Sequence, residues 1–241
     1  MFDQLVIGTV ASDDEYGATV SSRVIKDPPK KKITKTVPFS NATYDFSKIN
    51  GEIYWDQREL EYELEMLASS YEELEEMKMR FSNWVMNVME EELHDPFIPD
   101  YHFIATYESK EFDDDESGLK TTVKVKFMAY PYKIANAPKK FSVTMEDGTY
   151  SKWLPVYNNS SHKVVPIITV TGGMTDIHLN FDEPNSISYY GVGSADGKSE
   201  TVVIEQFAIK PGESEFLLST NYAGFVTDKI TVEVSFYEEV F

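Results

Sequence analysis

The clearest alternation of apolar and polar positions lies in residues 58–66, which read RELEYELEM. Successive side chains of a β-strand point to opposite faces, so strict alternation predicts a strand with one buried face and one polar face. The apolar positions are Leu60, Tyr62, Leu64 and Met66. The polar positions are Glu59, Glu61, Glu63 and Glu65.

Residues 70–88 have the spacing of an amphipathic helix. Ser70 and Glu73 match a capping box at its start. Apolar residues then recur three and four positions apart, which places them on one face. They are Leu74, Met77, Phe81, Trp84, Val85 and Val88. We expect the apolar face of the strand to pack against this helix, mainly on Phe81 and Trp84.

Shorter strand patterns surround this strand and helix. The tip of one predicted hairpin, at 111–118, holds four consecutive acidic residues, but their spacing does not match a calcium-binding loop. We therefore expect a solvated tip. The remaining strands of the first half are predicted at 5–10, 19–25, 32–37, 101–109 and 119–132.

From Phe141 onward the sequence consists of short strand patterns, with turn residues about every 8–12 positions, as in a β-sandwich. Small residues and Pro138 precede them, so a boundary near Lys139 is expected. The sequence thus predicts a mainly β chain with one amphipathic helix, divided into residues 1–139 and 140–241. The later strands are expected at 141–145, 153–158, 165–171, 176–181, 186–190, 200–204, 215–219 and 230–237.

Charge changes this picture, because 22 Lys and Arg stand against 41 Asp and Glu, a net charge of −19. Nucleic-acid binding depends on Lys and Arg contacts to phosphates, so a chain this acidic is a poor candidate for gripping nucleic acid. The only basic run is Lys30, Lys31 and Lys32, which fits either a solvated strand edge or a contact to an acidic partner. The N-terminus lacks the pattern of a signal peptide, and no apolar stretch is long enough for membrane insertion.

Motifs that carry chemistry are missing from the sequence. The chain has no cysteine, which excludes disulfides, thiolate metal sites and cysteine nucleophiles. Its four histidines are too far apart in sequence for a local metal pair. Phosphate-binding glycine loops and a Gly-x-Ser-x-Gly elbow do not occur. We therefore expect no cofactor, no metal, no catalytic residue and no enzymatic activity.

The order of the elements resembles a known family. NATYDFSKING precedes the strand that begins at Arg58, the helix ends in NWVM, and EEELHDPFIPDYHF leads to a strand pair that ends in FMAYPYK. The second half contains VYNNSSHKVVPIITVTG and QFAIKPGESEFLL and closes with EVSFYEEVF. Over nearly its whole length the chain resembles the distal tail proteins (Dit) of siphophages, which also occur in phage-tail-like particles.

The resemblance implies a belt-like first domain, from which six copies form a ring, and a galectin-like β-sandwich as the second domain. The implied function is that of a structural hub of the virion tail tip. The implied partners are the tail tube protein, a tail-tip or tail-associated protein and the tape measure protein. DNA would pass through the ring without specific binding.

Two interpretations remain for the four glutamates of 58–66. They form an ordinary solvated strand face, or they line the channel of the implied ring, where their charge would repel phosphates. The channel interpretation fails if these side chains point to the outer solvent or pair with lysines across a subunit boundary.

An alternative function is glycan binding by the β-sandwich, for attachment to a host cell surface. The sugar would stack on exposed aromatic rings, although such residues more often belong to the core or to cross-strand pairs. The candidates are Trp153, Tyr157, Tyr189 and Tyr190. A hydrolase is the third interpretation, and no group of residues supports it.

Overall fold

The computed structural model describes residues 4–36, 43–47, 53–146, 151–171, 176–181, 191–192, 199–203, 208–220 and 229–241. Contacts divide the chain into unit 1, residues 1–133 with Phe241, and unit 2, residues 134–240. This division falls after Lys133, whereas the sequence predicts a boundary after Lys139. The assignment of the two parts as a belt-like and a galectin-like domain remains a prediction.

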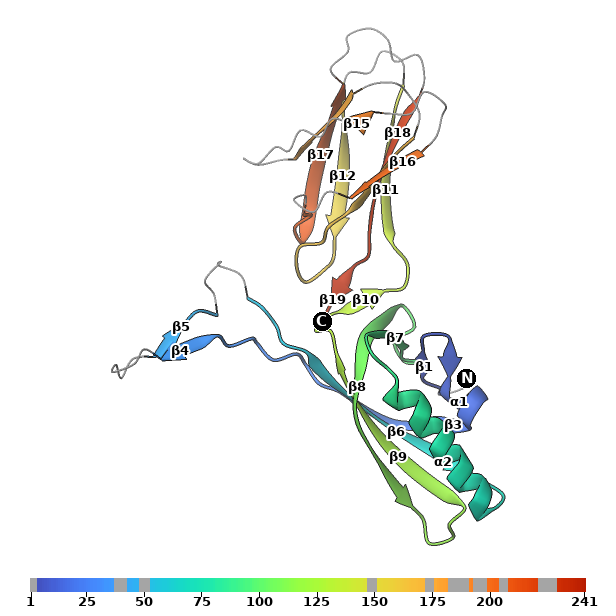
Figure 1. The fold of residues 1–241 in the computed structure, drawn as a ribbon. Coiled ribbons are helices and arrows are strands. Elements are labelled where there is room, and N and C mark those ends of the chain that lie inside the picture. The colour runs from blue at the N-terminus through green and yellow to red at the C-terminus, as the bar shows by residue number, and fades with distance from the viewer. Residues whose placement is uncertain are drawn as a thin grey trace. The chain divides into compact units, whose positions relative to one another are not determined.

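Unit 1 is built on an antiparallel sheet with the strand order β2-β1-β7-β8-β9-β6-β3 (Figure 1). Strand β6 lies between β9 and β3 and carries the alternating segment. The strands are β1 (Val6–Ile7), β2 (Val10–Ala11), β3 (Ala18–Ile25), β6 (Arg58–Leu67), β7 (Glu91–His94), β8 (Tyr101–Asp114) and β9 (Lys120–Ala129). Between β3 and β6 the chain forms a separate two-stranded ribbon of β4 (Thr34–Thr36) and β5 (Thr43–Asp45).

The alternation in β6 separates core from solvent. Leu60, Tyr62, Leu64 and Met66 have no exposed surface and belong to the core of unit 1. This face of the sheet packs against helix α2 (Tyr71–Met86). The helix contributes three buried apolar residues to the same core, which are Leu74, Phe81 and Val85. Trp84 is partly buried and packs against the cluster.

Helix α2 begins as its sequence predicts. The Ser70 hydroxyl accepts the backbone N–H of Glu73 at 3.2 Å, which satisfies one of the free N–H groups at the helix start. The carboxylate of Glu73 reaches back to the backbone N–H of Ser69 at 2.7 Å, one residue before the N-cap. The reciprocal half of the capping box is therefore shifted by one position.

A second helix, α1 (Ser12–Tyr16), occupies a segment where the sequence analysis expects only strands and loops. Gly17 ends it with a φ of +62°, a conformation that favours glycine. The buried Ser12 hydroxyl ties the turn to the sheet, because it accepts the N–H of Leu5 and donates to the carbonyl of Ala18. Tyr16 then stacks on Trp84 of α2, with ring centroids 4.8 Å apart.

Two strand predictions in unit 1 need correction. Residues 91–94 form β7, although the sequence analysis assigns no strand there. Strand β8 continues to Asp114, beyond the predicted end at Ser109, because its far half stays paired with β9. Asp113 and Asp114 therefore belong to a strand, and the turn is shorter than predicted.

Unit 2 contains two four-stranded antiparallel sheets that share one apolar core, as in a β-sandwich. The first sheet has the order β11-β18-β13-β16 and the second β12-β17-β14-β15. The strands are β11 (Lys139–Met145), β12 (Ser151–Asn158), β13 (Ile167–Thr171), β14 (Asp176–Phe181), β15 (Gly191–Val192), β16 (Ser199–Val203), β17 (Gly212–Thr220) and β18 (Ile230–Phe236).

Two short strands, β10 (Lys133–Ala135) and β19 (Glu239–Val240), pair with each other. The strand predicted at 186–190 lies outside the described residues. The fold class predicted from the sequence, mainly β with an amphipathic helix, is confirmed.

Candidate functional site

The polar face of β6 carries a set of paired charges. Each of the four glutamates lies within ion-pair distance of a lysine of unit 1. The pairs are Glu59 with Lys26 at 2.6 Å, Glu61 with Lys126 at 3.4 Å, Glu63 with Lys124 at 3.1 Å and Glu65 with Lys120 at 2.9 Å. Lys126 also lies 3.6 Å from Glu59. We call these eight residues the ladder.

Strand register explains the ladder. Glu61 lies directly opposite Lys126, and Glu63 directly opposite Lys124, on the neighbouring strand β9. Opposite charges in such cross-strand positions attract, whereas the four glutamates alone would repel. The sequence analysis names no cations beside these glutamates, whereas in the structure the ladder carries equal numbers of positive and negative charges. Whether the ladder faces a channel stays a prediction.

The ladder shifts the protonation of its members. A hydrogen bond from Lys26 is the main cause that lowers the pKa of Glu59. Hydrogen bonds to Glu63 and Glu61 raise the pKa of Lys124 and of Lys126, respectively. A lowered glutamate pKa stabilises the fold above the ordinary pKa of glutamate, and a raised lysine pKa stabilises it below that of lysine. The ladder therefore stabilises unit 1 between these limits.

Substitution Glu59→Gln tests this pH window. We expect a small loss of unfolding free energy at pH 7 and low salt, because exposed ion pairs contribute little. The difference should shrink with added salt. It should also shrink below the ordinary pKa of glutamate and vanish as the pH falls through the lowered pKa of Glu59, where the folded parent protein loses this charge too. Urea unfolding at several pH values measures it, with Glu213→Gln as the control, and a pH-independent difference would contradict an ionic origin.

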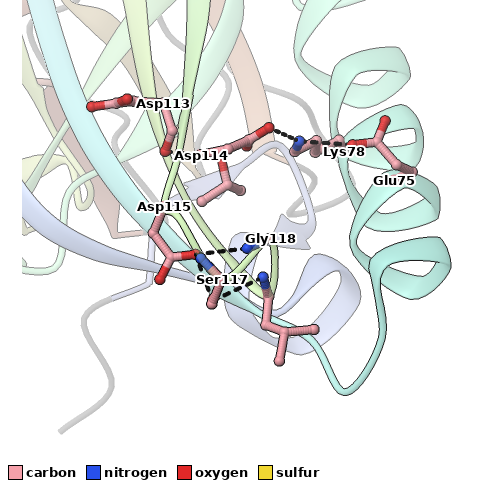
Figure 2. A network of polar contacts seen from close by, with 9 residues as sticks. Glu75, Lys78, Asp113, Asp114, Asp115, Ser117 and Gly118 are labelled. Carbon is pink, nitrogen blue, oxygen red and sulfur yellow. Dashed lines mark hydrogen bonds and ion pairs between the residues drawn. The ribbon is translucent and has the colours of Figure 1, made fainter.

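The acidic tip after β8 is held by internal contacts, as Figure 2 shows. Lys78 of α2 donates to Asp114 at 2.6 Å and to Glu75 at 2.8 Å. Asp115 accepts hydrogen bonds from the backbone N–H groups of Ser117 and Gly118, and from the Ser117 hydroxyl, which closes the turn. Hydrogen bonds from Lys78 and from Ser117 are the main causes that lower the pKa of Asp114 and of Asp115. Among the described residues no group of acids and histidines has the arrangement of a metal site.

A buried carboxylate joins three segments of unit 1. Asp95, which is 2% exposed, forms an ion pair with Arg23 of β3 and accepts a hydrogen bond from the Tyr62 hydroxyl at 3.1 Å. Its second oxygen accepts the backbone N–H of Phe97 at 2.8 Å. The guanidinium of Arg23 also lies over the Phe97 ring, 4.5 Å from its centroid. Asp95 therefore fastens the loop after β7 to the central sheet.

Arg58 is the largest fully buried side chain of the described residues that carries a charge. Its Nε and Nη2 atoms have no hydrogen-bond partner among the described residues, and its guanidinium lies 5.7 Å from the centroid of the Phe103 ring. Burial lowers the pKa of Arg58, and the charge of Asp27 partly offsets this effect. Arg58 is one of the residues on which the family resemblance rests.

Only two of the four aromatic residues proposed for glycan stacking lie in the described part of the chain. Trp153 and Tyr157, on the outward face of β12, are 51% and 47% exposed. The Lys139 ammonium lies 5.5 Å from the centroid of the Tyr157 ring. Tyr189 and Tyr190 lie outside the described residues. Glycan binding therefore stays a prediction.

The fold can be compared with known proteins. No family model matches the sequence, and no curated protein matches it. Among solved structures the chain shares the mainly β fold of a phage distal tail protein. That structure is the crystal structure of SPP1 Dit (gp 19.1), described as a paradigm of the hub adsorption apparatus in phages that infect Gram-positive bacteria.

The similarity to SPP1 Dit extends over both units. It covers 97% of this chain and 98% of that one, with a TM-score of 0.63 and 13% sequence identity. The resemblance predicted from the order of the elements is thereby confirmed for the fold. No helix in the described part of the chain has the length and apolar character needed to cross a membrane.

Proposed function

We propose that the chain is a structural subunit of a phage tail, a distal tail protein in the virion or in a phage-tail-like particle. The observation that carries this proposal is the shared fold over nearly the full length of both chains. A partial match could arise from one common β-sandwich, but agreement over 97% of the chain requires the same two units in the same order. The proposed role needs no catalytic residue.

The proposal includes a ring of six copies that joins the tail tube to the tip or adsorption apparatus. Unit 1 is the ring-forming domain, and unit 2 is a galectin-like domain on the outside. A closed ring requires two different contact surfaces on each subunit. Unit 1 has two unlike sheet edges, the two-residue strand β2 and the eight-residue strand β3. The proposed partners are the tail tube protein, a tail-tip protein and the tape measure protein.

The ladder is the proposed wall of the channel through which DNA passes. Glu111 and Asp113 of β8 extend its face, opposite Lys124 and Thr122, so this surface has a net charge of −2. The carboxylates hold the lysine ammoniums by ion pairs, which leaves these lysines less available to phosphates. DNA would then adhere only weakly to this surface, because its lysines are paired and its net charge is slightly negative. Unpaired glutamates are not needed for this effect.

Antibody labelling of intact particles tests the proposed function. A label against the full-length chain should appear at the distal end of the tail in electron micrographs, where the tube meets the tip. Labelling of the capsid, labelling along the tube, or a complete lack of label on particles would overturn the proposal. Negative-stain images of the concentrated protein test the ring, which should have six-fold symmetry and a central hole that admits duplex DNA.

A further inference from the structure

The described residues between β3 and β6 extend away from the sheet of unit 1. We call these residues, 26–36, 43–47 and 53–57, the arm. Its two sides are joined by backbone hydrogen bonds from Lys31 to Tyr54 and from Asp56 to Pro29, each 2.9 Å long, and by the β4–β5 pairing. Figure 1 shows the arm leaving the sheet on the side away from α1 and α2. A two-stranded ribbon without a further layer is only marginally stable in water.

The arm carries apolar side chains that a covering surface would bury. Four of its large apolar residues are between 37% and 43% exposed. They are Ile33, Phe46, Ile53 and Tyr54. The arm is also basic, since its five lysines outnumber its three acidic residues, in a chain with a net charge of −19. Its partner surface should therefore combine acidic groups with exposed apolar side chains.

The outward face of α2 has this combination. Glu72, Met79 and Met86 lie seven residues apart, so they follow one line along the helix, opposite the core residue Phe81. Met79 and Met86 are 60% and 57% exposed. Glu76 lies beside this line, and neither Glu72 nor Glu76 has a cation partner among the described residues.

The neighbouring helix adds to this acidic surface. Helix α1 contributes Asp13, Asp14 and Glu15, and the two helices together hold seven acidic and two basic residues. One of the two basic residues, Lys78, is already paired with Glu75 and Asp114. The surface thus has an acidic excess that matches the basic arm.

We propose that the arm of one copy docks on the outward face of α2 in the next copy. Lys31 and Lys32 would meet Glu72 and Glu76, and the exposed apolar residues of the arm would cover Met79 and Met86. Because the arm and α2 lie on different sides of unit 1, each subunit has one donor and one acceptor surface, the head-to-tail arrangement that closes a ring. This inference rests on the proposed function, and it names the contact that holds the ring.

Single cysteines test this contact directly, because the native chain has none. Lys31→Cys and Glu76→Cys proteins are mixed as full chains under mild oxidation and analysed by non-reducing gel electrophoresis. We expect about tenfold more disulfide-linked heterodimer than from Lys31→Cys mixed with the control Glu213→Cys, because docking raises the effective concentration of the pair. Equal yields with the control, or linkage of Lys31→Cys mainly to itself, would overturn the inference.

Charge reversal gives a second measurement. The Lys31→Glu/Lys32→Glu protein should assemble only at roughly tenfold higher concentration in sedimentation experiments, since a few exposed ion pairs are lost at each contact. Mixing it with Glu72→Lys/Glu76→Lys protein should restore assembly. Lys30 is left unchanged because its ammonium lies over the Trp55 ring.

The outcomes separate the two proposals. If antibody labels the tail tip but neither cysteine linkage nor charge reversal behaves as expected, the arm contact is wrong and the proposed function stands. Linkage of the Lys31→Cys arm to a different tail protein within particles, without linkage to a second copy, also overturns the arm contact. Specific linkage without labelling of the tail would retain the contact and overturn the proposed function.

Discussion

Phe81→Ala is expected to lower the unfolding free energy of unit 1 by about 3–5 kcal/mol, the usual cost of removing a large aromatic side chain from a packed core. Phe81 is 1% exposed and lies where α2 meets the sheet. It also makes edge-to-face contacts with Tyr16 and Trp84, at centroid distances of 6.1 and 5.6 Å. The substitution therefore leaves a cavity and loosens both helices from β6.

Urea unfolding of the full chain, followed by tryptophan fluorescence and far-UV circular dichroism, measures this effect. Met89→Ala is the matched control, because Met89 lies just after the same helix and is 74% exposed. It should change the unfolding free energy by less than about 0.5 kcal/mol. Equal effects of the two substitutions would contradict the assignment of Phe81 to the core.

Asp95→Ala is expected to cost about 3 kcal/mol, at the lower end of the range for breaking a buried ion pair. It leaves the guanidinium of Arg23 and the hydroxyl of Tyr62 without their shared acceptor. The Arg23 side chain is 28% exposed, so water recovers part of the loss. Asp95→Asn should cost less, because it keeps an oxygen for the N–H of Phe97.

The alkaline limit of stability tests the same cluster. Burial is the main cause that raises the pKa of Tyr62 well above its usual value, and the charge of Asp95 adds to it. A raised pKa favours folding below the ordinary tyrosine pKa, and this contribution is lost as the pH rises toward the folded-state value. Tyr62→Phe should therefore make stability less sensitive to pH above about 10. The control for Asp95→Ala is Asp100→Ala, which removes an exposed carboxylate. Equal losses of unfolding free energy from the two substitutions would contradict the proposed role of Asp95.

The secondary structure could be predicted from local sequence where a segment is long enough to show a repeating pattern of apolar residues. Strand β6 and helix α2 each extend over ten or more residues, so their apolar spacing is unambiguous. Helix α1 has only five residues and β7 only four, too few for a period to show. Their conformation depends on tertiary contacts, such as the Ser12 hydroxyl between Leu5 and Ala18.

The charged face shows a different limit of sequence reasoning. The alternation in β6 identifies which glutamates share a face, but Lys124 and Lys126 lie about sixty residues further along the chain. Only the register of β6 on β9 brings them together. In the same way, no local pattern connects Arg23, Tyr62 and Asp95, which are far apart in the sequence. The sequence shows only that Pro96, directly after Asp95, ends the strand there.

The two apolar clusters have no residue in common among those described, since one ends at Ala129 and the other begins at Val143. A substitution inside one cluster therefore removes no side chain from the other. Over evolutionary time, the interior of each half is free to accumulate mutations at its own rate. Lineages can then remodel the interior of one unit while that of the other is inherited intact.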